Sequence, residues 1–234
     1  MMLPSKPMTS PSSVNALANP AASVEFHVRN RSAYRIFTAS VMSTQETLPA
    51  RLVACAIVAA TVAETERLVI RAWTHSESDL DRLFDTYSRF EVVQYLGSYP
   101  KPMSSRDQAP AAVDRWAARC TPDGRYGVWA VQVKQTGVIA GTVLLVPLPD
   151  ETDVVEVGWH FHPDSWGNGY ATEAAAALLR KGFADGLSEI YAVVRPENEA
   201  SLNVCRRLGM THLGRTSRWY DAVLEQFRLG APAS

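Results

Sequence analysis

Residues 154–173 read VVEVGWHFHPDSWGNGYATE, and this stretch decides the fold because its residue pattern changes sharply along its length. The first part is rich in valine and continues with Trp159 and Phe161 at a period of two, which predicts a β-strand. Pro163 lacks a backbone N–H group and ends this strand. Two glycines then flank Asn168, and a run of good helix formers follows. The stretch therefore predicts a strand, a glycine turn and the start of a helix in direct succession.

A strand that leads through a glycine turn into a helix forms a site for an anionic ligand. Glycine lets the backbone approach the ligand closely, and the free N–H groups of the first helical turn point towards it. A dinucleotide-binding fold requires a third glycine and an acidic residue about twenty positions later. Here Gly169 is followed by Tyr170-Ala171-Thr172, so the third glycine is missing. The motif indicates a phosphate or pyrophosphate site, and a tight turn without a ligand remains the alternative.

Three stretches resemble the GCN5-related N-acetyltransferases, the GNAT family. Trp166-Gly167-Asn168-Gly169-Tyr170-Ala171 is similar to the family's acetyl-CoA-binding loop, which reads Gln/Arg-x-x-Gly-x-Gly/Ala. Trp166 replaces the usual Gln or Arg, as in the RimJ/RimL-like branch, which includes the ribosomal-protein acetyltransferases. The segments 65–71 and 198–210 resemble the opening strand and the late helix of the same branch. The resemblance covers the chain from residue 64 onwards.

The resemblance implies an α+β fold, an α/β/α sandwich known as the GNAT acyl-CoA N-acyltransferase fold. Its twisted sheet is mixed and mostly antiparallel, with helices on both faces. The pattern of the remaining sequence agrees, because segments of period two alternate with segments of helical period. Strands are predicted at 67–73, 126–134, 138–146, 190–194, 211–218 and 223–229, and helices from Ser76 or Ser78 to Tyr87 and at 111–119, 170–184 and 199–208.

The composition of the 234 residues excludes several classes of protein. The net charge is −1 and the basic residues form no clustered stripe, so nucleic-acid binding is not expected. The three cysteines lie far apart, which is neither a disulfide framework nor a zinc pattern and favours a reducing, cytoplasmic compartment. The apolar run 52–62 is too short to cross a bilayer. We expect a cytoplasmic monomer or homodimer that does not bind membranes.

Residues 1–62 do not read as part of the folded domain, which we assign to residues 63–234. The first 23 residues are rich in Pro, Ser, Ala and Asn, and such a segment cannot bury enough surface to offset its ordering entropy. Three interpretations are open: a disordered extension or upstream stretch before the true start codon, an organellar transit peptide, or a signal peptide starting at Met42. A cytosolic cofactor argues against the last.

The resemblance implies that acetyl-CoA is the acetyl donor and that the site contains no metal. Its pyrophosphate would bind the backbone N–H groups of the glycine turn and of the first turn of the following helix. Its pantetheine arm would pair with the end of the preceding strand and hydrogen-bond to Asn198. The expected cofactor-binding residues are Phe161, His162, Trp166, Gly167, Asn168, Gly169, Tyr170, Ala171, Thr172 and Asn198.

Acetyl transfer to an amine requires a route for one proton, because amines are protonated near neutral pH. Glu156 is the candidate base, since it lies on the strand two residues before Gly158, where related members carry a glutamate. Alternatively, Glu156 faces solvent or pairs with an arginine such as Arg67 or Arg71. Ser201 is the candidate donor of a proton to the leaving thiolate.

The acceptor is the least determined part of the prediction. It is a protein N-terminal amine or a small-molecule amine, bound by the loop 99–109 and by the last hairpin, where Tyr220 could reach it. His160 and His162 point to the same side of a strand, which is half a metal site, but no third ligand lies nearby in the sequence. A non-catalytic acyl-CoA-binding protein with the same fold is the second hypothesis, and a nucleotide-dependent oxidoreductase is the third.

Overall fold

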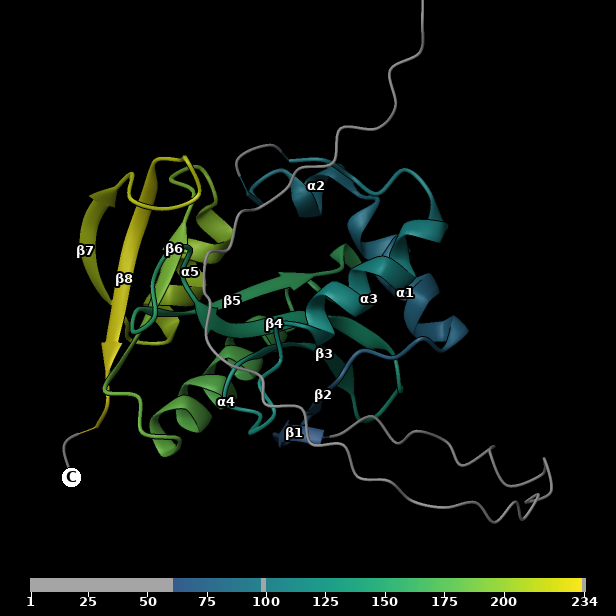
Figure 1. The fold of residues 1–234 in the computed structure, drawn as a ribbon, viewed down its shortest axis with the longest axis horizontal. Coiled ribbons are helices and arrows are strands. Elements are labelled where there is room, and N and C mark those ends of the chain that lie inside the picture. Colours follow the sequence, from purple (N-terminus) through teal and green to yellow (C-terminus); the bar gives the residue numbers. More distant parts are fainter. Residues whose placement is uncertain (1–60, 98–99, 233–234) are drawn as a thin grey trace, which may run out of the picture. The chain divides into compact units, whose positions relative to one another are not determined.

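The computed structural model describes residues 61–97 and 100–232, whose strands form one eight-stranded sheet (Figure 1). The strands are β1 (Thr61–Glu64), β2 (Leu68–Arg71), β3 (Gly127–Val133), β4 (Ile139–Pro147), β5 (Val155–Phe161), β6 (Glu189–Val194), β7 (Thr211–Thr216) and β8 (Leu224–Gly230). The helices are α1 (Glu77–Tyr87), α2 (Phe90–Val93), α3 (Ala109–Ala117), α4 (Tyr170–Ala184) and α5 (Glu199–Arg207), with short 3-10 turns at Arg106–Gln108 and Pro163–Ser165.

The strand order across the sheet is β1-β2-β3-β4-β5-β6-β8-β7. Every neighbouring pair is antiparallel except β5 and β6, which are parallel. This mixed, mostly antiparallel sheet with its helices confirms the predicted fold class. None of the helices in the described ranges is long and apolar enough to cross a membrane.

The sequence predicted the order of these elements correctly from β2 onwards, missed β1, and placed the ends of the elements less accurately. The helix α4 has its predicted bounds, and Ser76 is the N-cap of α1. The helix α3 begins at Ala109, two residues before its expected start. The expectation for the start of the domain was wrong, because Thr61 and Val62 belong to β1, which pairs with β2. Residues 1–60, on which the three interpretations of the N-terminal segment depend, lie outside the described part.

Helices cover both faces of the sheet. Successive side chains of a strand point to opposite faces, so neighbouring residues of one strand belong to different buried clusters. Val131 of β3 belongs to the larger buried cluster, which includes the inner side chains of α4 and α5. Its neighbour Ala130 belongs to a second cluster, which is formed with α1, α2 and α3. Figure 1 shows these three helices gathered beside the half of the sheet that contains β3 and β4.

The sheet opens between β5 and β6, in the middle of the strand order. The strands β4 and β5 pair continuously from Gly141↔Phe161 to Pro147↔Val155. By contrast, β5 and β6 pair at the single register position Glu156↔Tyr191. Beyond Glu156 the two strands separate, so the second half of β5 has an unpaired edge. A ligand can pair with the backbone there, as a further strand would.

Candidate active site

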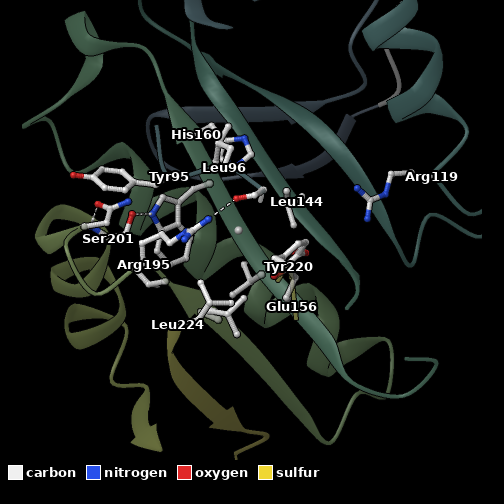
Figure 2. Close-up of a pocket in the computed structure, with 18 residues that line it drawn as sticks. Tyr95, Leu96, Arg119, Leu144, Glu156, His160, Arg195, Ser201, Tyr220 and Leu224 are labelled. Atoms are coloured by element: carbon white, nitrogen blue, oxygen red, sulfur yellow. Dashed lines mark hydrogen bonds between the residues drawn. The ribbon is translucent and has the colours of Figure 1, made fainter. Parts of the chain in front are cut away.

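Two cavities lie along this opening and share part of their walls. The larger, of about 1140 Å³, is lined by the glycine turn, the start of α4 and α5. The smaller, of about 220 Å³, lies between β5 and β6 and is shown in Figure 2. The residues that line both cavities are Tyr95, Leu96, Trp159, His160, Asn198 and Ser201. We use the term junction for the place, bounded by these six residues, where the two cavities meet. A molecule in one cavity can touch a molecule in the other at this place.

The glycine turn has the geometry of an anion site. Gly167 and Gly169 have φ angles of 78° and 77°, a left-handed conformation that strains any residue with a Cβ atom. No backbone N–H group in the range 167–172 has a hydrogen-bond partner in the described part of the chain, whereas the N–H of Glu173 begins the helical series. The N–H of Trp166 donates to the carbonyl of Pro163, 3.1 Å away, so it is not available for a ligand. The backbone N–H groups are therefore open from residue 167 onwards, and that of Trp166 is not among them.

Arg67, which lies directly before β2, holds the glycine turn in place. Its Nη1 donates to the carbonyl of Asn168 at 3.0 Å, and its Nε donates to the carboxylate of Glu173 at 2.7 Å. Its guanidinium also lies over the ring of Tyr170, 4.9 Å from the centroid. The carboxylate of Glu173 is thereby paired, which limits its repulsion of an anion bound in the larger cavity.

The edge of β5 provides backbone groups to the larger cavity, but not at every predicted position. The N–H of His162 donates to Ala140 of β4, and its carbonyl accepts from Ser165, so both groups are used within the fold. His162 also lines neither cavity. Because backbone N–H groups alternate in direction along a strand, those of Phe161 and Trp159 face the open side. The expectation that the backbone of His162 is available to the cofactor is therefore wrong, whereas the N–H groups of Phe161 and Trp159 are open.

Asn198 and Ser201 lie at the start of α5 and reach the junction. The side-chain carbonyl of Asn198 accepts from the N–H of Ser201 at 3.1 Å, so Asn198 is the helix cap. The side-chain NH₂ group of Asn198 has no hydrogen-bond partner among the described residues. Its two N–H donors are therefore available to a ligand in the cavities. The hydroxyl of Ser201 accepts from the indole N–H of Trp159 at 3.2 Å and retains its own proton for donation.

Glu156 lies at the centre of the smaller cavity with its carboxyl group buried. It is 8% exposed, and the hydroxyl of Tyr220 donates to its Oε1. Burial raises the pKa of Glu156 from the usual 4.5 to about 7, although the Tyr220 hydrogen bond and the charge of Arg119 act in the opposite direction. A carboxyl group with this pKa can hold and release a proton near neutral pH.

The alternative that Glu156 forms an ion pair with Arg67 or Arg71 is excluded. Arg67 pairs with Glu173, and Arg71 forms two hydrogen bonds to Asp79. Neither guanidinium therefore neutralises the buried carboxylate of Glu156.

A strained turn holds Tyr220 against Glu156. Tyr220 and Asp221 have φ angles of 60° and 45° in the connection between β7 and β8. This conformation is costly for residues with a Cβ atom, and such strain concentrates at functional sites. Burial, followed by the charge and hydrogen bond of Glu156, raises the pKa of Tyr220, so its hydroxyl remains protonated. Tyr220 is thus a hydrogen-bond donor to Glu156.

The raised pKa of Glu156 predicts a dependence of stability on pH. The folded chain holds this proton up to about pH 7, whereas the unfolded chain releases it near pH 4.5. The stability that the bound proton contributes is therefore complete below pH 4.5 and is lost as the pH rises through 7. At about 1.36 kcal/mol per pKa unit the loss is about 3 kcal/mol.

Urea unfolding of the wild type and of Glu156→Gln at about pH 5 and about pH 8 measures this loss. Because Gln cannot ionise, the variant should become more stable relative to the wild type by about 3 kcal/mol between the two pH values. A stability difference that stays constant with pH would contradict the raised pKa.

His160 lies at the junction. The sequence had suggested only that it could be one of two ligands in a metal site. The hydroxyl of Tyr87 donates its one proton to Thr142 at 2.9 Å, so Nδ1 of His160, 3.0 Å from the same oxygen, must be the donor of that bond. Burial lowers the pKa of His160 to about 4, which keeps the ring neutral. Nε2 is then a hydrogen-bond acceptor on a ring that lines both cavities.

The other predicted features of the site have structural roles. Nε2 of His162 lies 2.9 Å from Asp85, and its Nδ1 accepts from the backbone N–H of Asp164. Within the described ranges, no group of three or more His, Cys, Asp or Glu side chains is placed to hold a metal ion. Burial raises the pKa of the Cys205 thiol to about 12, which disfavours a thiolate nucleophile there.

Comparisons with known proteins agree with this geometry. The model of the acetyltransferase (GNAT) domain matches residues 67–211. The chain is 32% identical over 154 residues to an uncharacterized N-acetyltransferase, YoaA, of Bacillus subtilis (strain 168), covering 65% of this chain and 84% of that protein.

Two solved structures share the fold. A GNAT-family acetyltransferase from Bacillus anthracis superposes with a TM-score of 0.60 at 23% identity, covering 72% of this chain and 98% of that one. The ribosomal L7/L12 alpha-N-protein acetyltransferase RimL in complex with coenzyme A gives a TM-score of 0.62 at 16% identity, covering 75% and 100%. The family model matches more than half of the chain, and this chain therefore belongs to the GNAT family of acetyltransferases.

Proposed function

We propose that this protein transfers an acetyl group from acetyl-CoA to a primary amine by direct attack within a ternary complex. The observation that carries the proposal is the junction of the two cavities. A buried carboxyl group with a pKa of about 7 lies in the smaller cavity. The larger cavity begins at a series of open backbone N–H groups. The carboxyl group is what an amine acceptor requires, and the N–H groups are what the pyrophosphate of a CoA thioester requires.

The larger cavity would hold acetyl-CoA. The N–H groups of residues 167–172 would bind the pyrophosphate, since a helix N-terminus favours an anion. The backbone of Phe161 and Trp159 at the open edge would pair with the pantetheine arm, and the free amide of Asn198 would donate to it. The arm would then direct the thioester to the junction.

At the junction, the side chains of this chain would move the protons. Glu156 would accept the proton of the ammonium group, and Nε2 of His160 would orient the neutral amine by accepting a hydrogen bond from it. As the amine nitrogen forms its bond to the carbonyl carbon, the backbone N–H of Trp159 would stabilise the oxyanion. The carbon–sulfur bond then breaks, Ser201 protonates the thiolate, and one of the two protons on the former amine nitrogen restores the serine while the other stays as the amide N–H. Glu156 would release its proton to solvent.

A thermal-shift titration of the full chain with acetyl-CoA, CoA and NAD tests the assignment of the larger cavity. A ligand that binds only the folded state raises its stability, by about 2.7 kcal/mol at a hundred times its Kd. We expect acetyl-CoA and CoA to raise the Tm and NAD to leave it unchanged. A rise with NAD alone, or with none of the three, would contradict the proposal.

A further inference from the structure

The smaller cavity carries a net positive charge, which limits the amines that it can accept. Its charged lining residues in the described part of the chain are Glu156, Arg119 and Arg195. His160 is neutral, because burial lowers its pKa. With Glu156 ionised the cavity therefore has a charge of +1, and an acceptor with several positive charges would be repelled.

Arg119 is placed to bind an anion in this cavity. It follows α3 and is exposed, and its side chain makes no hydrogen bond or ion pair with any residue of the ranges 61–97 and 100–232. Its charge acts on the carboxyl group of Glu156, so the two side chains share one site. A guanidinium with no partner of its own has all five of its donors available for a planar anion.

Arg195 differs from Arg119 because its guanidinium is already engaged. Its Nη2 donates to the carbonyl of Gly97 at 2.7 Å, which fixes it as a wall of the cavity. Figure 2 shows Arg195 and Arg119 on opposite sides of the Glu156–Tyr220 pair, with Arg195 on the side of Ser201. An acceptor with its amine at the junction would therefore extend past Glu156 towards Arg119.

We propose that the acceptor is a small amine that also carries a carboxylate, with the amine at the junction and the carboxylate bound by Arg119. This inference rests on the proposed acetyl transfer and names its substrate class. Once Glu156 has taken the proton of the amine, the lining carries the two positive charges of Arg119 and Arg195, and the carboxylate of the acceptor offsets one of them. The amine at the N-terminus of a protein has an amide in place of that carboxylate, and a polyamine adds positive charge. The cavity volume of about 220 Å³ is also that of a small molecule.

The test compares acceptors that differ only in the anionic group. Thiol release from acetyl-CoA is measured with the full chain, using free amino acids, their amides, aminoalkylphosphonates, a short unmodified peptide and a polyamine. We expect kcat/KM for the amino acids to exceed that for their amides by about tenfold to hundredfold, the effect of one charged hydrogen-bonded pair. A preference for the phosphonates or the amides would overturn the carboxylate assignment.

The role of Arg119 is tested with a matched variant on α3, the helix that precedes it. Arg119→Gln should reduce the ratio of acid to amide activity to near one, chiefly by raising KM for the acids. Arg115→Gln, four residues earlier, should keep the wild-type ratio, since Arg115 is exposed and lines neither cavity. An unchanged ratio in Arg119→Gln would overturn the inference. Acetylation of amides or polyamines alone would overturn it and leave acetyl transfer intact, whereas no acetylation of any amine would refute both.

Discussion

Glu156→Gln is expected to lower kcat for amine acetylation by about 10²- to 10⁴-fold, the usual contribution of a general base. The amide of Gln can still accept a hydrogen bond from Tyr220, so the shape of the cavity is kept while the proton acceptor is removed. The Kd for acetyl-CoA should stay within about twofold of the wild-type value, because Glu156 does not line the larger cavity. Steady-state kinetics and a binding titration on the same preparation measure both quantities.

The matched control for this variant is Glu66→Gln, at an exposed position that lines neither cavity. It should retain wild-type kcat and Kd. If Glu156→Gln acetylated amines at the wild-type rate, Glu156 would not be the base. If Glu156→Gln lost acetyl-CoA binding and folded stability together, its role would be structural.

Gly167→Asp is expected to weaken acetyl-CoA binding by about tenfold to hundredfold, because it places a carboxylate beside the proposed pyrophosphate site. A Cβ atom at this position would meet no other atom within 4 Å, so the added side chain has room. Two like charges about 4 Å apart repel by about 1 to 4 kcal/mol, depending on the local dielectric. Isothermal titration with acetyl-CoA at low and high salt measures the effect, which salt should reduce.

Gly167→Asn separates this charge effect from backbone strain. Asn and Asp have nearly the same shape and both tolerate the left-handed conformation that Gly167 adopts at φ 78°. We therefore expect Gly167→Asn to bind acetyl-CoA markedly better than Gly167→Asp, at similar Tm. Equal affinities of the two variants would show that no phosphate lies near this turn.

Features encoded by neighbouring residues were predictable from the sequence. The glycine turn between Phe161 and Tyr170 follows from the end of one periodic pattern, two glycines and the start of another. The cap of α5 at Asn198 and the positive φ of Gly209 after that helix follow in the same way. In each case the signal lies within a few residues, because backbone conformation there is set locally.

Features that depend on register or on distant contacts were not predictable. Whether the N–H of His162 is available to a ligand depends on the register of β5 against β4. A shift of one residue in this register would turn that N–H from β4 to the open edge. The partners of Glu156 and His160, Tyr220 and Tyr87, lie 64 and 73 residues away in the sequence, so only the tertiary fold brings them together. No pattern in the sequence distinguishes Arg119 from other surface arginines, and its proposed role in binding the acceptor follows only from the cavity that it lines.

The most direct test of the account is to incubate the full chain with acetyl-CoA and a mixed set of primary amines and to identify products by mass spectrometry. The account predicts an N-acetylated amine formed in equal amount with free CoA by the wild type, and formed at least about a hundredfold more slowly by Glu156→Gln. Tight binding of acetyl-CoA without any acetylated amine in the wild type would contradict the central claim, and would indicate an acyl-CoA-binding protein that does not catalyse transfer.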